Sequence, residues 1–188
     1  MKRTVVLGLV AAAILVMFTL LVVGQEKMAM PFGGDADVAF ANKLWEGIEG
    51  YTEWPIKSKV YVGQSPHGAY LRMYYNVVNL DGKPYHIIIK DNYMGKDAAG
   101  NEVDLETVAK SPQKYLAAVT PMVQREDGYD SDNNDWFYAK FNPDGTIAKN
   151  PKDMLLAGRV AKGMDAGCIA CHKAAKGNDY LFVNDGDM

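Results

Sequence analysis

Five residues near the C-terminus, Cys168-Ile169-Ala170-Cys171-His172, constrain this chain more than any other segment. They include the only two cysteines of the chain, spaced two residues apart, with a histidine directly after the second. This spacing is the attachment signature of c-type haem. Each thiol would form a thioether with one haem vinyl group, and His172 would bind the iron from the proximal face. The sequence therefore predicts a fold that holds one covalent haem c.

Other interpretations of the two cysteines fit less well. A thioredoxin-like redox motif would need a βαβ setting, which the surrounding sequence does not show. A structural zinc site needs four ligands, and only His67 and His86 remain as nitrogen donors, both far upstream. A disulfide across two intervening residues would close a very small loop and add little stability.

The N-terminal segment predicts export. Lys2 and Arg3 precede an uncharged apolar run from Val5 to Val23, which is the layout of a secretory signal. The run is also near the length that spans a bilayer, so residues 1–24 are either a signal peptide or an uncleaved anchor that tethers the protein through residues 5–23. In both cases the basic residues stay in the cytoplasm. The rest of the chain then lies in the periplasm, where c-type haem is attached.

Beyond this segment, residues 25–34 are predicted to be a flexible lead, and residues 35–188 have the size of one domain. Hydrophobic residues make up 48% of the chain, which is enough for a core. The net charge of −3 argues against nucleic acid as a partner.

The remaining sequence mixes helical and strand patterns. Asp35 or Asp37 caps a helix whose apolar residues recur at helical spacing. Alternating patterns predict strands over 69–78, 85–90, 119–125 and 135–141, and further helices are predicted over 104–117 and 151–163. An Asp81-Gly82 turn joins the first two strands into a hairpin. This order indicates an α+β fold, an antiparallel β-sheet packed with helices, which ends in the C-terminal CxxCH haem-attachment segment.

Several stretches resemble the cytochrome P-460 family together with its relative cytochrome c′-beta. The resemblance covers most of residues 40–184 and rests on Ser65-Pro66-His67-Gly68, Ile88-Ile89-Lys90-Asp91-Asn92-Tyr93, Gly128-Tyr129-Asp130, the strand Asp135-Trp136-Phe137-Tyr138-Ala139-Lys140-Phe141, Pro143-Asp144-Gly145, and Cys168–His172 with Gly177-Asn178-Asp179-Tyr180. The haem motif alone is not specific to this family. The Asp-Trp-Phe-Tyr-Ala-Lys strand, its Pro-Asp-Gly turn and a C-terminal CxxCH together are much more specific.

The resemblance implies a homodimer with a five-coordinate haem c, proximal His172 and an open distal side that binds nitric oxide. Some members oxidise hydroxylamine, and here the electrons would pass to a soluble electron-transfer protein. In those members a lysine forms an extra covalent bond to the porphyrin, and a distal carboxylate handles protons. Lys90 matches that lysine best, and His86 and Ile88 on the same strand face would then point toward the haem. Glu126 is the nearest acid to the strand that would carry the carboxylate.

Three functions stay open on the sequence alone. A hydroxylamine-oxidising enzyme would use Lys90 and a proton acceptor such as Glu126. A nitric-oxide-binding cytochrome without turnover would have a pocket with no proton acceptor. A six-coordinate electron carrier would need His67, His86 or a methionine on the iron, but only Met188 follows the haem motif, where small electron carriers usually place that methionine.

Overall fold

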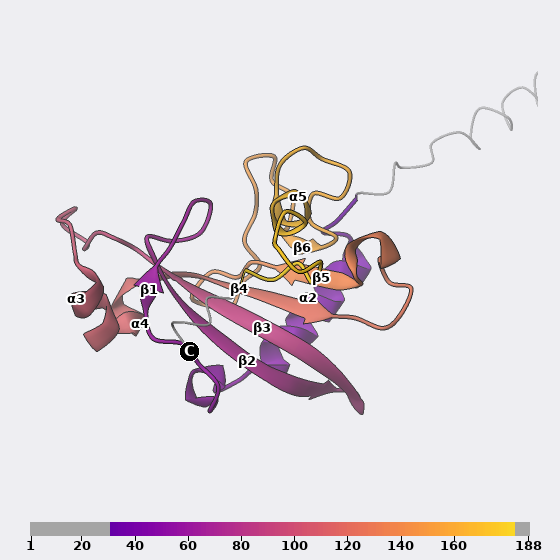
Figure 1. Cartoon of the computed structure of the whole chain (residues 1–188), viewed down its shortest axis with the longest axis horizontal. Coiled ribbons are helices and arrows are strands. Elements are labelled where there is room, and N and C mark those ends of the chain that lie inside the picture. Colours follow the sequence, from indigo (N-terminus) through magenta and orange to yellow (C-terminus); the bar gives the residue numbers. More distant parts are fainter. Residues whose placement is uncertain (1–30, 183–188) are drawn as a thin grey trace, which may run out of the picture. The chain divides into compact units, whose positions relative to one another are not determined.

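The computed structural model describes residues 31–182 of the chain (Figure 1). The predicted export segment, residues 1–24, lies outside the described residues, as do most of the predicted lead and residues 183–188. Within the described part, no helix is long and apolar enough to cross a membrane.

One antiparallel sheet forms the centre of this part of the chain. Its six strands follow one another in sequence order, so that each strand pairs with the next. They are β1 (Tyr61–Val62), β2 (Tyr70–Leu80), β3 (Lys83–Tyr93), β4 (Leu116–Gln124), β5 (Trp136–Ala139) and β6 (Ala157–Gly158). The turn between β2 and β3 uses positive φ angles at Asp81 and Gly82, as a tight hairpin turn requires. The arrangement confirms the predicted α+β class with an antiparallel sheet.

Short helices surround the sheet (Figure 1). They are α2 (Asp35–Gly47), η1 (Tyr51–Glu53), α3 (Leu105–Lys110), α4 (Pro112–Tyr115), η2 (Ser131–Asn133) and α5 (Cys168–His172). The helix predicted over 104–117 is divided, because Ser111 leaves the helical region and Pro112 has no N–H to continue the hydrogen-bond ladder. The chain then enters β4 earlier than predicted, at Leu116.

The two faces of β3 have different neighbours. Ile87 and Ile89 are fully buried in the main core, together with Ala41 and Leu44 of α2. Side chains alternate across a strand, so Ile88, Lys90 and Asn92 point to the opposite face, which the C-terminal part of the chain covers. The strand thus divides its residues between the core and a pocket.

The helix predicted over 151–163 is wrong. Asp153, Gly158 and Ala161 have φ angles of 63°, 102° and 64°, which a right-handed helix cannot contain. The segment instead pairs with its neighbours: the Leu156 N–H donates to the Ala148 carbonyl at 2.8 Å, and the Lys140 N–H donates to the Leu156 carbonyl at 3.0 Å. Its apolar residues are buried by this pairing and not by a helical face.

A buried carboxylate ties β3 to the core. Asp91 is fully buried and accepts hydrogen bonds from the hydroxyls of Tyr51 at 2.6 Å, Tyr93 at 2.9 Å and Tyr74 at 3.2 Å. Burial raises the pKa of Asp91, while the three hydroxyls act in the opposite direction. A buried carboxylate is tolerated only when its oxygens have hydrogen-bond partners. Because these partners come from β2, β3 and η1, the bonds to Asp91 join the three elements.

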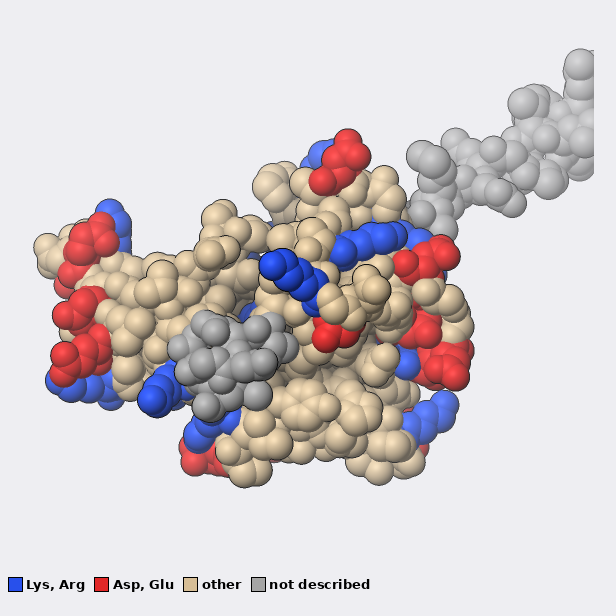
Figure 2. All heavy atoms as spheres, viewed as in Figure 1, with Lys and Arg blue, Asp and Glu red and all other residues tan. Residues whose placement is uncertain are grey.

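In the view of Figure 2, the lower centre of the face, over the β2–β3 hairpin, is largely uncharged. Val77 on this hairpin is 46% exposed. The Tyr75 hydroxyl lies 3.1 Å from Nδ1 of His86 across the hairpin, in an exposed setting.

Replacing Tyr93 with Phe is expected to lower the free energy of unfolding by about 1.5–3 kcal/mol, the usual range for a hydrogen bond to a charged group. Tyr75→Phe is the matched control, because its hydroxyl bonds in an exposed setting, and its effect should stay within about 0.5 kcal/mol. Urea denaturation of the purified variants measures both. Equal effects of the two substitutions would contradict the role given to Asp91.

Candidate functional site

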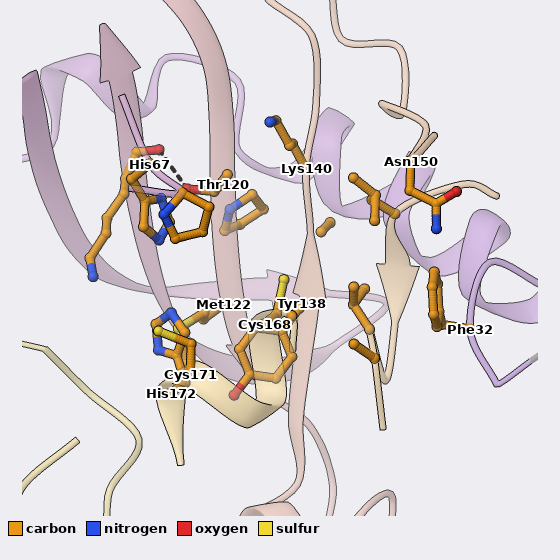
Figure 3. A pocket seen from close by; sticks show the side chains of 18 of the residues that line it. Phe32, His67, Thr120, Met122, Tyr138, Lys140, Asn150, Cys168, Cys171 and His172 are labelled. Atoms are coloured by element: carbon orange, nitrogen blue, oxygen red, sulfur yellow. Dashed lines mark hydrogen bonds between the residues drawn. The ribbon is translucent and has the colours of Figure 1, made fainter. Parts of the chain in front are cut away.

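A pocket of about 410 Å³ lies between the sheet and the C-terminal part of the chain (Figure 3). Its lining is mostly apolar, with Phe32, Pro66, Ile88, Pro121, Met122, Ala139, Leu156, Val160, Ala161, Met164, Ala166 and Gly167. The polar members are His67, Lys90, Asn92, Thr120, Tyr138, Lys140, Asn150, Cys168, Cys171 and His172. The predicted haem-attachment residues and Lys90 therefore lie around one cavity.

Helix α5 presents the two cysteines and the histidine. Ile169 anchors it by packing into a buried cluster with Tyr138, Val160 and Ala161. Gly167 precedes the helix with φ 130°, and a Cβ there would lie 2.3 Å from Cβ of Ala161. Only glycine fits this close approach, which sets how near the start of α5 comes to the segment around Ala161.

His172 is held as a neutral imidazole with one nitrogen free. Its ring is 6% exposed, and burial lowers its pKa to about 4. Nδ1 lies 2.7 Å from the carbonyl oxygen of Tyr180, so Nδ1 carries the proton and donates it. Nε2 is left as a lone pair. A backbone carbonyl on the far nitrogen is the usual support of a histidine that binds a metal.

Both cysteines of α5 are free thiols that line the pocket. Cys168 is largely enclosed, and burial raises the pKa of its thiol to about 11. Cys171 is exposed. The two thiols and His172 follow one another on a single turn of helix, where Figure 3 shows them on the same side of the pocket.

Lys90 lies on the pocket side of the central strand β3. Its side chain is 7% exposed, and burial lowers the pKa of its ammonium group. Cys171 and His172 are close enough to interact with it electrostatically. Within residues 31–182, no carboxylate forms a salt bridge with Lys90, so its buried amine has no acidic partner in this part of the chain.

His67 comes from the turn between β1 and β2 and lies on the other side of the pocket from His172 (Figure 3). Its Nδ1 is 2.9 Å from Oδ1 of Asn92. Asn92 is 5% exposed, and its Oδ1 also accepts the Gly68 N–H at 3.2 Å. The Asn92 amide nitrogen donates to the Lys90 carbonyl at 2.9 Å and to Thr120 Oγ1 at 3.0 Å. Asn92 thus joins β3, β4 and the turn that carries His67.

The lining residues suit haem. None of the described residues around the pocket is Asp or Glu, and two are the cations Lys90 and Lys140. Haem is a flat apolar macrocycle with two carboxylate groups, so it needs an apolar wall and cations near its edge. The site provides both, together with two free thiols and a neutral imidazole for the iron.

Two residues considered from the sequence lie elsewhere. Glu126 does not line the pocket: its carboxylate binds the Arg125 guanidinium at 2.8 and 2.9 Å, which lowers its pKa to about 2. His86 shares a strand face with Ile88 and Lys90, but only the latter two reach the pocket. His86 contacts Tyr75 instead.

Other pocket residues were not singled out from the sequence. Asn92 could have been found, because it is two residues from Lys90 on the same strand face. Lys140 could have been found in the same way, because it is two residues from Tyr138. The strand β5 itself ends one residue earlier, at Ala139. No sequence pattern pointed to Phe32, because it comes from a segment predicted to be a flexible lead. In the structure its side chain is 2% exposed and belongs to the same buried cluster as Ile169 of α5.

The comparisons with known proteins agree with this geometry. A family model described as Cytochrome P460 matches residues 48–183, which include the sheet and α5. Among curated proteins and solved structures, none matches the chain.

Proposed function

Because the chain belongs to the cytochrome P460 family, we propose that it is a haem c protein that binds nitric oxide in the pocket, on the side opposite His172. Family membership implies haem binding. Covalent attachment, the ligand and the periplasmic location are parts of the proposal. The observation that carries it is a buried neutral His172, with Nε2 free, beside two free thiols on the wall of an apolar pocket.

Cys168 and Cys171 would hold the haem by thioethers, and Nε2 of His172 would bind its iron. The Tyr180 carbonyl keeps the His172 ring in one orientation and one tautomer. Lys140 on the pocket wall would pair with a haem carboxylate. When bound, haem supplies an iron centre that takes small ligands and exchanges single electrons.

The chain's own residues favour a small neutral ligand. Ile88 and Met122 are buried, and with Pro121 they give the sheet side of the pocket an apolar surface. Such a wall excludes water and disfavours ions, which lose hydration without gaining a partner. Nitric oxide and neutral hydroxylamine are the small nitrogenous molecules that meet this condition.

Ligand binding is better supported than turnover. Oxidation of hydroxylamine releases protons along with electrons, and a positioned base accepts such protons. No carboxylate lines the pocket among the described residues, and Glu126 is paired with Arg125 outside it. Hydroxylamine oxidation, with electrons passing to a soluble electron-transfer protein, is therefore the second candidate, and the buried Lys90 is the observation that favours it.

The ferrous holoprotein is expected to bind one nitric oxide per chain, seen as a shift of its Soret absorption band during titration. Hydroxylamine with an artificial electron acceptor should give no sustained turnover, because no carboxylate among residues 31–182 lines the pocket. An absorption spectrum that nitric oxide leaves unchanged would contradict the proposal. Sustained turnover would instead establish the second candidate.

We also propose that Lys90 forms a third covalent link to the porphyrin, as the family resemblance implies. Burial favours its neutral amine form, and no acid among the described residues holds the side chain elsewhere. Formation of the link would remove one hydrogen from Nζ and one from the porphyrin carbon, and would pass two electrons to an oxidant such as a peroxide. Lys140 lines the same pocket and serves as the matched control.

Mass spectrometry of a tryptic digest is expected to recover the Lys90 peptide joined to the haem peptide, and the ferrous Soret band should be strongly red-shifted. Lys90→Leu should lose the link and the red shift but retain haem on Cys168 and Cys171, whereas Lys140→Leu should keep both. An unmodified Lys90 peptide from the wild-type holoprotein would contradict the proposed cross-link. Loss of haem from Lys90→Leu would show that Lys90 is needed for folding rather than for the link.

The protein is further proposed to be a homodimer in the periplasm. The largely uncharged face over the β2–β3 hairpin, with Val77 46% exposed, supports a contact between two copies there. We expect Val77→Glu to convert the dimer to a monomer in sedimentation velocity. A wild-type protein that sediments as a monomer would refute this pairing.

A further inference from the structure

Helix α5 brings the site to the protein surface at Cys171. This cysteine lines the pocket and is exposed, whereas Cys168 is largely enclosed. A haem bonded to Cys171 would therefore have one edge at the surface. Electron transfer between two proteins requires a close approach of their redox centres, so an exposed edge marks the place where a partner protein can act.

Phe182 connects the buried His172 ring to the same surface. The His172 ring is 6% exposed, and the Phe182 side chain is 46% exposed. The two ring centroids are 5.5 Å apart, and the ring planes are inclined by 70°. Only one side chain thus separates the predicted iron ligand from solvent on this side. A large apolar side chain that stays exposed among polar neighbours is typical of a contact surface for another protein.

The charge next to α5 is opposite in sign to that of the whole chain. The chain has a net charge of −3. Residues 159–182 instead carry an excess of cations, namely Arg159, Lys162, Lys173 and Lys176 against Asp165 and Asp179. Lys162 is paired with Asp130. Lys173 and Lys176 are exposed and form no salt bridge within residues 31–182, so their charges are available to a partner.

We propose that Cys171, Lys173, Lys176 and Phe182 form the docking surface for an acidic one-electron carrier protein that reduces the haem. This inference rests on the proposed function, because nitric oxide binding is proposed for the ferrous form, and it names the partner that supplies that form. One electron passes from the reduced carrier to the ferric iron, which becomes ferrous, and no proton has to move. Unpaired cations beside an apolar side chain fit a carrier with carboxylates around its own redox centre, since complementary charges speed the encounter.

Reduction of the ferric holoprotein by reduced plant-type ferredoxin, a strongly acidic one-electron carrier, is the direct test. Stopped-flow absorption at the Soret band measures the second-order rate constant. Replacing Lys173 and Lys176 together with Glu should lower this rate constant about tenfold or more at an ionic strength of about 0.01 M. The difference should largely disappear at about 1 M, where charges are screened within about 3 Å. An unchanged rate constant at low ionic strength would overturn the proposal.

The matched control replaces Lys83 and Lys114 together with Glu, which changes the net charge by the same amount. Both lysines are exposed, and they belong to β3 at its hairpin turn and to α4. These two places lie apart from α5 in Figure 1. The rate constant of this control should stay within about twofold of the wild type. An equal fall in both double variants would assign the effect to net charge and overturn the docking surface.

Phe182→Ala tests the apolar part of the docking surface. It should slow reduction by ferredoxin at low and at high ionic strength, because it removes an apolar contact and no charge. Met94→Ala is its control, since Met94 is 43% exposed in another part of the chain. Equal rates for wild type and Phe182→Ala would remove Phe182 from the docking surface and contradict the proposal.

Two other occupants of this surface would give different results. Cosedimentation with phosphatidylglycerol vesicles that the double substitution of Lys173 and Lys176 abolishes, with no change in the ferredoxin rate constant, would assign the surface to a membrane. A Phe182→Ala protein that sediments as a monomer while the wild type sediments as a dimer would assign it to a second copy of the chain. Either result would overturn the proposal.

Nitric oxide titration after reduction by dithionite separates this inference from the proposed function. The double variant at Lys173 and Lys176 should then bind nitric oxide like the wild type, because dithionite replaces the protein partner. A normal nitric oxide response together with an unchanged ferredoxin rate constant overturns the docking surface alone. A charge-dependent ferredoxin rate constant in a protein whose spectrum nitric oxide leaves unchanged supports the docking surface and refutes the proposed function.

Discussion

The structure depends on the burial of three consecutive polar residues, Lys90, Asp91 and Asn92, on the central strand β3. Each would cost several kcal/mol in an apolar setting without partners. Asp91 points to the core and is satisfied by three tyrosine hydroxyls. Asn92 points to the pocket and is satisfied by β4 and by the turn that carries His67. Lys90 has no acidic partner within residues 31–182, and its amine faces the pocket.

The buried polar residues of β3 position only one of the two sides of the site. The sheet side carries Lys90 and, through Asn92, the turn with His67. The other side is α5, where Ile169 packs with Tyr138 of the sheet and Gly167 allows a close approach to Ala161. The site is assembled where the two meet, with a neutral imidazole on each side and no carboxylate in its described lining.

Much of the sheet and of the sheet side of the site could be predicted, since both depend on the spacing of residues that are close in sequence. Alternation along β3 placed Lys90 and Ile88 together, and the Asp81-Gly82 turn specified the hairpin. The predictions were wrong where the structure depends on contacts that the local sequence pattern does not reveal. The segment 151–163 has helical apolar spacing, but it satisfies its backbone by pairing with 140 and 148. Glu126 is near the pocket strand in sequence, yet its strongest partner is Arg125. His86 shares the face of Lys90 but lies too far along the hairpin to reach the pocket.

The sequence by itself predicted a haem-binding protein, because the two thiols and His172 lie within one helical turn and need no distant residue to be recognised. It also determined the antiparallel sheet, since strand periodicity and turn residues are local signals. Only the tertiary structure decided what lies opposite His172. His67 is about a hundred residues away in the chain, and its hydrogen bond to Asn92 places its ring 6.3 Å from that of His172. No single segment encodes this arrangement, because it arises only when the β1–β2 turn and α5 pack on the same sheet face.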